Sequence, residues 1–98
     1  MHIISWKKLD DFIRKNPNSE SPLKSWFKIL KNSNFKDFNE LRKVFNSVDQ
    51  VENLTVFNIG GNKFRLIVAI HFNRQKVFIR NVLTHSEYDK EKWKKEII

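Results

Sequence analysis

The fold is decided in the second half of the chain, where residues 54–84 read LTVFNIGGNKFRLIVAIHFNRQKVFIRNVLT. Three runs within this stretch are rich in the β-branched and aromatic residues that favour strands: Leu54–Ile59, Phe64–Phe72 and Val77–Leu83. Gly60–Lys63 holds both glycines of the chain and is typical of a hairpin turn. Asn73–Lys76 separates the second run from the third in the same way. These features predict three antiparallel strands in one sheet.

Alternation along the central run shows which side of the sheet faces the core. Its even-numbered positions are all apolar: Phe64, Leu66, Val68, Ile70 and Phe72. Because strand side chains alternate between faces, this side should pack on helices. A four-residue loop at the second turn places Ala69 opposite Arg80, so that Arg65 and Arg80 share the opposite face. Asn58 joins that face if the first turn has two or four residues, whereas a one-residue slip of the last strand would bury Arg80.

The first half of the chain has the apolar spacing of helices. Apolar residues recur every three to four positions in three segments: Trp6–Lys15, Leu23–Leu30 and Phe38–Phe45. Ser5 can cap the first helix, and Pro22 suits the first turn of the second. Asp37 and Glu40 resemble a capping box before the third. The residues before the first helix, Met1–Ile4, read as a short strand at one side of the sheet.

The expected fold is therefore α+β, in a single domain over residues 1–98. A chain of this length can bury one two-layer core. We expect an antiparallel sheet of about four strands packed against the N-terminal helices. Thr84 or Ser86 can cap a short C-terminal helix that continues through Tyr88 and Trp93.

The charge of the chain predicts an anionic partner. Lysine and arginine number 19 against 11 acidic residues, which gives a net charge of +8. No acidic residue lies between Asn53 and Ser86, a stretch that carries five basic ones: Lys63, Arg65, Arg74, Lys76 and Arg80. A phosphate-facing surface explains such a run, and chance combined with solubility is the plainer alternative. Nucleic acid is the first partner to expect.

The sequence also excludes several classes of protein. It contains no cysteine, which removes disulfides and thiolate chemistry. No apolar run approaches the roughly 20 residues of a membrane span, and the first residues lack the layout of a signal peptide, so we expect a cytoplasmic protein without membrane contact. No nucleotide-binding loop, catalytic-triad order or metal motif is present, and the 3 histidines are scattered, so we expect no metal or other cofactor.

One cluster could carry chemistry, at the predicted junction of the last strand with the C-terminal helix. It combines a guanidinium, an imidazole, a phenol and two carboxylates: Arg80, His85, Tyr88, Glu87 and Asp89. RNA cleavage needs a base for the 2′-hydroxyl, an acid for the 5′ oxygen and cations for the charged phosphorane. Arginine suits the last role, histidine can serve as acid or base, and tyrosine beside cations can do so with a lowered pKa. Each residue also has a structural reading, as a helix cap, a packed aromatic or a partner of the helix dipole.

Two runs of the sequence resemble a known family. Residues 56–67, VFNIGGNKFRLI, and residues 77–89, VFIRNVLTHSEYD, are similar to the signature segments of HigB-type toxins of the RelE superfamily. Met1–Ile4 followed by a helix and the segment Phe35–Asp49 fit the same pattern, so the resemblance covers essentially the full length. It implies an mRNA endonuclease, usually acting on the ribosome, that is neutralised by a helix-turn-helix, HigA-like antitoxin.

The resemblance also implies roles for individual residues. It indicates a catalytic set of four: Arg65, Arg80, His85 and Tyr88. Arg80 matches the arginine of the family's last strand and is expected to clamp the phosphate, while the assignment of acid and base stays open. The resemblance and the acid-free run together point to five further RNA contacts: Asn58, Asn62, Lys63, Arg74 and Lys76.

Two other classes stay open. A non-catalytic RNA-binding protein would expose aromatic side chains on its sheet to stack bases, but Phe57, Phe64 and Phe72 are expected on the core face. A structural partner in a protein complex could use an apolar surface on the other face: Leu54, Val56, Ile67, Ala69 and Val82. Such a surface is compatible with a toxin, because an antitoxin must cover part of it. We expect the antitoxin to bind the basic, partly apolar sheet face or the junction of strand and helix near His85.

Overall fold

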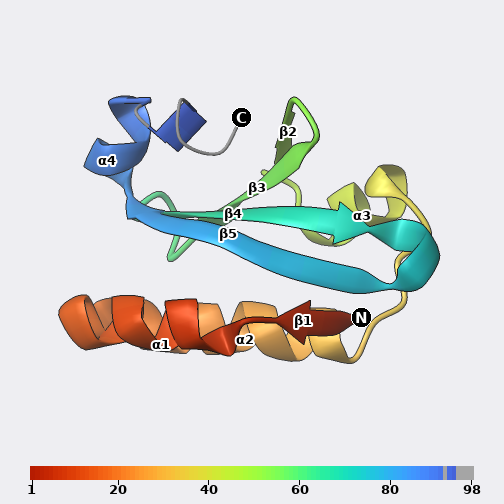
Figure 1. The fold of residues 1–98 in the computed structure, drawn as a ribbon, viewed down its shortest axis with the longest axis horizontal. Coiled ribbons are helices and arrows are strands. Elements are labelled where there is room, and N and C mark those ends of the chain that lie inside the picture. The colour runs from red at the N-terminus through yellow and green to blue at the C-terminus, as the bar shows by residue number, and fades with distance from the viewer. Residues whose placement is uncertain (92, 95–98) are drawn as a thin grey trace.

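The computed structural model describes residues 1–91, 93 and 94, and its elements confirm an α+β fold (Figure 1). The N-terminal part contains β1 (His2–Ile4), α1 (Trp6–Lys15), α2 (Glu20–Lys31) and α3 (Phe38–Val44). The C-terminal part contains β2 (Asp49–Val51), β3 (Leu54–Ile59), β4 (Phe64–His71), β5 (Lys76–Thr84) and α4 (His85–Asp89). Among all the residues that the structure describes, no helix is both long enough and apolar enough to cross a membrane.

Within the described residues the sheet has five strands, in the order β1-β5-β4-β3-β2. The strands from β2 to β5 are antiparallel to their neighbours, whereas β1 is parallel to β5. The sheet differs from the expected one in two details, since β1 runs parallel to β5 and there are five strands where about four were expected. The fifth strand, β2, reads Asp-Gln-Val, and this short polar segment lacks the pattern by which strands are recognised.

The direction of β1 follows from the place where its first residues are held. The amino group of Met1 donates hydrogen bonds to the carbonyl oxygens of Leu30 (3.0 Å) and Ser33 (2.7 Å), at the C-terminal end of α2. The last carbonyls of a helix carry partial negative charge, so a cation is favourable there. The amide of His2 donates to the carbonyl oxygen of Gln75 at 2.8 Å. These contacts start β1 beside the start of β5, which makes the two strands parallel.

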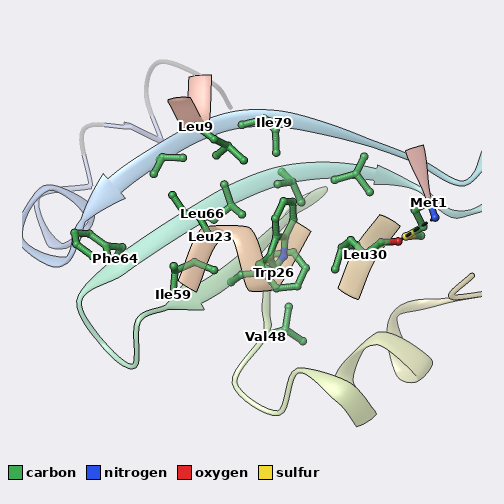
Figure 2. Close-up of a cluster of buried hydrophobic side chains, with 14 of the residues drawn as sticks. Met1, Leu9, Leu23, Trp26, Leu30, Val48, Ile59, Phe64, Leu66 and Ile79 are labelled. Atoms are coloured by element: carbon green, nitrogen blue, oxygen red, sulfur yellow. Dashed lines mark hydrogen bonds between the residues drawn. The ribbon is translucent and has the colours of Figure 1, made fainter. Parts of the chain in front are cut away.

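Helices α1 and α2 cover one face of the sheet, and the main hydrophobic core lies between them and the sheet (Figure 1). The even-numbered side chains of β4 point into this core, which confirms the alternation argument. Phe64, Leu66 and Val68 are each at most 5% exposed. Figure 2 shows the core residues that α1 and α2 contribute beside them: Leu9, Leu23, Trp26 and Leu30.

The turn between β4 and β5 lies one residue earlier than expected. It spans residues 72–75 instead of 73–76, which shifts the pairing of the two strands by two residues and leaves their faces unchanged. Gln75 fixes this turn, because its backbone adopts a positive φ of 55° and its side-chain amide donates to the carbonyl oxygen of Phe72 at 2.8 Å.

A β-bulge at Arg80 moves the register by one further residue. The irregularity lies opposite Ile67 and Val68 of β4, and Arg80 has no cross-strand partner. Beyond the bulge the two faces of β5 are exchanged, so Val82 packs in the main core and not on the outer surface expected for it. The expected position of Arg80 opposite Ala69 is wrong because the earlier turn places Phe78 opposite Ala69. The bulge then leaves Arg80 without a partner on β4, and alternation does not reveal where such an extra residue is inserted.

The N-terminal helix caps agree only in part with the expectation. Ser5 adopts a φ of 82° and its side chain makes no capping hydrogen bond, so its expected role as a cap is wrong. The Asp37 side chain accepts a hydrogen bond from the Glu40 amide at 3.0 Å, as expected. The Glu40 carboxylate, however, accepts from the amide of Lys36 at 2.7 Å and does not close a box with Asp37.

The C-terminal helix is shorter than expected. Thr84 caps α4, and Glu87 completes a capping box by accepting from the Thr84 amide at 3.0 Å. α4 ends at Asp89, so the expected single helix through Trp93 is wrong, although Trp93 and Lys94 are helical again after the break. Glu91 adopts a positive φ of 56°, and Trp93 packs on the face of the sheet that the N-terminal helices leave open.

Replacing Leu66 with alanine should lower the free energy of unfolding by about 2–5 kcal/mol, because this fully buried side chain would leave a cavity in the main core. Ile29 provides the control, since it is 40% exposed on α2 and Ile29→Ala should change stability by less than about 0.5 kcal/mol. Chemical denaturation followed by circular dichroism measures both effects. Equal losses in the two variants would contradict the placement of the core on this face of β4.

Candidate functional site

The candidate site lies where the turn between β3 and β4 meets the start of α4, at one end of the sheet (Figure 1). The amide of His85 donates to the carbonyl oxygen of Lys63 at 2.9 Å, which attaches α4 to this turn. Gly60 and Gly61 adopt φ values of 63° and 69°, a conformation that glycine accepts without strain. The term "corner" is used below for five residues: Asn62, Lys63, Arg65, His85 and Tyr88.

Arg65 is held firmly at the centre of the corner. It lies directly opposite Asn58 of β3, so the two residues share one face of the sheet, as expected for a first turn of two or four residues. The residue is only 9% exposed, so it is not the open surface group that the sequence predicts. Its guanidinium donates to the side-chain oxygen of Asn62 at 2.6 Å, and to the carbonyl oxygens of Asn62 and Phe64 at 3.3 and 3.2 Å. These bonds compensate the burial of a charged group and fix its orientation.

Helix α4 places Tyr88 against Arg65. The guanidinium carbon of Arg65 lies 5.4 Å from the centroid of the Tyr88 ring, which is a cation–π contact. Trp93 stacks on the same ring, with 5.1 Å between centroids and 15° between planes. The structure therefore brings two of the four predicted catalytic residues into contact.

The pKa of Tyr88 is raised above its ordinary value of 10.0, chiefly because burial disfavours the charged phenolate. The carboxylate of Asp49 in β2 raises the pKa further, while Lys94 and Arg65 act in the opposite direction. The expected lowered pKa of Tyr88 is therefore wrong, because burial outweighs the effect of the neighbouring cations. The phenol stays protonated at neutral pH, so it can donate a proton or a hydrogen bond but is a poor base.

A second hydrophobic cluster covers the sheet face on which Arg65 lies. Four side chains of β3 and β4 are buried in it: Leu54, Val56, Ile67 and Ala69. Trp93 is buried in the same cluster, with Tyr88 and Leu83 packed at its margin. The apolar surface that the sequence predicts as open to a partner is thus covered, at these positions, by residues of the C-terminal segment.

His85 begins α4 and pairs with Asp89 one helical turn later. Its Nδ1 lies 3.3 Å from Oδ2 of Asp89, and its side chain is 40% exposed. The carboxylate orients the imidazole and leaves Nε2 as the ring nitrogen for other contacts. The i,i+4 spacing of this pair is visible in the sequence, which therefore already allows a contact between His85 and Asp89.

Arg80 was expected on the outer face of the sheet, the face turned away from the helices. In the structure it lies beside α1 instead. It is exposed at the bulge and lines a cleft of 660 Å³ between α1 and β5, here called the α1–β5 cleft. Lys8 and Lys15 of α1 line the same cleft, and Lys8 Nζ donates to the Arg80 carbonyl oxygen at 3.2 Å. Asp11 and Glu87 add two carboxylates. Because Glu87 belongs to α4, the cleft and the corner are neighbours at this helix.

Arg74 and Lys76 lie at the far end of the hairpin formed by β4 and β5. Lys76 pairs with His71, whereas Leu83 pairs with Arg65, seven residues further along β5. This separation is roughly 23 Å at ~3.3 Å per residue. The structure therefore does not bring these two predicted RNA contacts into the corner.

The residues close to the corner or the cleft that were not assigned there from the sequence include Lys8, Lys15, Asp49 and Trp93. They belong to α1, to β2 and to the segment after α4, and no local pattern signals that these segments meet the ends of β4 and β5. Among the residues that the structure describes, no group of three or more histidine, aspartate or glutamate side chains could hold a metal ion.

Comparison with known proteins gives a consistent result. Residues 19–91 match the family model of HigB toxins, described as RelE-like toxic components of a toxin–antitoxin system. The chain is 38% identical over 92 residues to the mRNA interferase toxin HigB of Escherichia coli K12. The matched segment covers 91% of this chain and 88% of that protein. The mRNA interferase HigB of Shigella flexneri matches with the same identity and coverage. The mRNA interferase HigB of Escherichia coli O6:H1 is 33% identical over 93 residues, or 92% of this chain and 90% of that protein.

The fold and the family match together define a RelE-like toxin of a toxin–antitoxin system. Within that class, the chain belongs to the HigB toxin family. The resemblance recognised in the sequence is thereby confirmed.

Tyr88 is the only tyrosine of the chain, so ultraviolet absorbance can follow its ionisation. We expect a midpoint above 10.0, and Asp49→Asn should move it down towards 10.0 because one of the raising contributions is lost. The folded state holds this proton more tightly than the unfolded chain does. The stability gained is therefore present below pH 10.0 and is lost as the pH rises through the folded-state pKa.

Asp10→Asn is the control for this titration, since Asp10 is a partly exposed carboxylate of α1 that does not contribute to the shift. It should leave the midpoint unchanged. A wild-type midpoint at or below 10.0 would show that the phenol is not buried as described.

Proposed function

We propose that this chain is an mRNA interferase, an endoribonuclease toxin that cleaves messenger RNA and is neutralised by an antitoxin. Membership of the HigB toxin family supports the proposal, as do the relatives that are named mRNA interferases. The observation that carries it is the corner, where a hydrogen-bonded arginine contacts a protonated phenol. The net charge of +8 suits a polyanionic substrate.

The first step of the reaction needs no water. The 2′-hydroxyl oxygen bonds to the adjacent phosphorus, and the bond from phosphorus to the 5′ oxygen breaks. One proton leaves the 2′ oxygen and one reaches the 5′ oxygen, so the products are a 2′,3′-cyclic phosphate and a 5′-hydroxyl. Negative charge accumulates on the phosphoryl oxygens in the transition state, where fixed cations and hydrogen-bond donors stabilise it most.

Tyr88 is the proton donor in this proposal, and His85 is the base. The raised pKa keeps the Tyr88 phenol protonated at neutral pH, and Arg65 beside it can neutralise a bound phosphate. Asp89 orients His85 through Nδ1, so that Nε2 can accept the proton of the 2′-hydroxyl. Histidine is suited to this role because its side chain exchanges protons near neutral pH.

Two arginines bind the reacting phosphate in this proposal. Arg65 is already oriented by Asn62, so it loses little freedom when a phosphate binds. Arg80 is exposed at the α1–β5 cleft and can approach the RNA from the other side of α4. Lys8 and Lys15 extend the positive surface of the cleft to neighbouring phosphates.

The remaining predicted contacts serve the RNA on either side of the cleaved bond. Asn58 lies opposite Arg65, and Lys63 lies in the adjoining turn, so both can contact nucleotides next to the corner. Arg74 and Lys76 are far from the corner and can contact only a strand that extends along the hairpin. We take ribosome-bound messenger as the substrate, as the family resemblance implies.

The antitoxin partner is a helix-turn-helix, HigA-like protein in this proposal. It acts by covering the corner or the α1–β5 cleft, because a protein placed there blocks RNA through its bulk and competes for the positive charge. We also propose a cytoplasmic location, because messenger and ribosomes are found there.

A non-catalytic RNA-binding protein is the second candidate, supported by the net charge alone. Such proteins stack bases on exposed aromatic side chains of a sheet. Phe57 and Phe64 are instead buried in the main core, and Phe72 packs against it. Binding without cleavage of a defined messenger would favour this candidate over the interferase.

Arg80→Ala should reduce the rate of messenger cleavage by on the order of a hundredfold, since one donor aimed at transition-state charge contributes about 3 kcal/mol. Arg80→Lys should recover only part of the rate, because an ammonium lacks the planar fork that binds two phosphate oxygens. The measurements are the rate with purified protein and the messenger 5′ ends mapped after induction in bacteria. Cleavage by Arg80→Ala at the wild-type rate would refute the proposed clamp.

Arg42→Ala is the matched control for Arg80. It removes the same charge from an exposed position on α3, at the end of the molecule opposite α4 (Figure 1). The rate of cleavage should not change in this variant. Circular dichroism of all variants separates a loss of catalysis from a loss of folding, and an unfolded Arg80→Ala would make Arg80 a structural residue.

Cleavage should persist after transition metals are removed, because the 2′-hydroxyl supplies the nucleophile and no metal-activated water is needed for this step. The chelator must spare magnesium, which ribosomes need to stay assembled. The rate on ribosome-bound messenger before and after chelation is the measurement. A loss that only a transition metal restores would contradict the proposed mechanism.

A further inference from the structure

Trp93 lies behind the corner and contacts it through Tyr88. Its side chain is 2% exposed and packs in the cluster formed by Leu54, Val56 and Ile67 on the outer face of the sheet. It therefore lies between the buried side chains of β3 and β4 and a side chain that is proposed to take part in the reaction.

Two contacts join Trp93 to Tyr88. The indole ring stacks on the phenol ring, with 5.1 Å between centroids and 15° between planes. The indole Nε1 donates to the Tyr88 carbonyl oxygen at 3.1 Å. The first contact fixes the plane of the phenol, and the second fixes the backbone from which it projects. Helix α4 has only 5 residues, too few to be stable by its own hydrogen bonds, so its position depends on contacts of this kind.

Trp26 shows how a purely structural tryptophan is packed in this chain. It is also 2% exposed, and its ring meets Phe57 edge-on in the main core, with 5.4 Å between centroids. Within the described residues, its indole N–H has no hydrogen-bond partner. Trp93 differs because both its stacking and its hydrogen bond are directed at one ionisable residue.

We propose that Trp93 is a positioning residue for RNA cleavage, which holds the phenol of Tyr88 against Arg65 and acts on the reaction through Tyr88. The inference rests on the proposed role of Tyr88 as proton donor. Loss of Trp93 leaves the basic residues that bind RNA in place and misplaces the donor. A displacement of about 1 Å at a reacting group can reduce the rate by on the order of a hundredfold.

Trp93→Leu tests this role directly, because leucine keeps an apolar side chain on the sheet but removes the stacking and the hydrogen bond. We expect kcat to fall about 10–100-fold while KM changes less than about threefold. Trp93→Phe retains a stacking ring and loses only the N–H donor, so its kcat should be intermediate. Trp26→Phe is the matched control and should leave kcat and KM unchanged. A large rise in KM with unchanged kcat in Trp93→Leu would overturn the proposal.

Combination with Tyr88→Phe separates positioning from a general structural effect. If Trp93 acts only through Tyr88, adding Trp93→Leu to Tyr88→Phe should cause no further loss of kcat. Multiplicative losses in the double variant would overturn the proposal. Full activity of Tyr88→Phe would overturn it as well, together with the assignment of Tyr88 as proton donor.

A titration of Tyr88 provides a readout that does not depend on activity. Trp93→Leu should lower the midpoint towards 10.0, because burial is the main cause of the raised pKa and the stacked indole supplies part of that burial. Trp26→Phe should leave the midpoint unchanged. If the wild-type protein cleaves no RNA, the proposed function fails, while this titration still shows whether Trp93 holds Tyr88. An unchanged midpoint in folded Trp93→Leu overturns the proposal. If Trp93→Leu does not fold, Trp93→Phe takes its place in every measurement.

Discussion

Burial of β4 on both faces is the constraint on which the rest of this molecule depends. Phe64 and Leu66 face α1 and α2, while Ile67 and Ala69 on the other side are 0% and 9% exposed. The N-terminal helices cover only the first of these faces (Figure 1). The outer face is closed by residues that follow β5, with Trp93 buried among the side chains of β3 and β4. Burial of this apolar surface is what favours the return of the chain after α4.

The return of the chain after α4 also builds the corner. It places Tyr88 beside Arg65, whose charge would be costly to bury without hydrogen bonds. Asn62, in the adjacent turn, accepts two of those bonds, one with its side chain and one with its backbone. The bonds that make burial of the guanidinium tolerable are the same bonds that orient it towards a substrate. In this toxin, stability and the proposed chemistry therefore depend on one set of contacts.

The bulge at Arg80 divides the positive surface into two parts, the corner with Arg65 and the α1–β5 cleft with Arg80. β1 accompanies β5 only from Lys76 to Phe78, and beyond that point α1 lies beside the strand. A bulge at such an edge redirects a side chain, and here it leaves Arg80 at the α1–β5 cleft with Lys8 and Lys15. Alternation alone predicts a row of arginines on one face, because it assumes an uninterrupted register. The inserted residue separates Arg80 from Arg65, and RNA is expected to contact both sides of α4.

The sequence by itself determined the properties that are local or periodic. Alternation along Phe64–Phe72 predicted the core face, a first turn of two or four residues put Asn58 on the same face as Arg65, and two sequence runs predicted the HigB family. Only the tertiary structure decided the parallel direction of β1, the register beyond the bulge and the position of Trp93. It also decided the raised pKa of Tyr88, because burial outweighs the cations that the sequence shows nearby. Periodicity records which side of an element a residue occupies, whereas register, burial and charge balance depend on segments that meet only after folding.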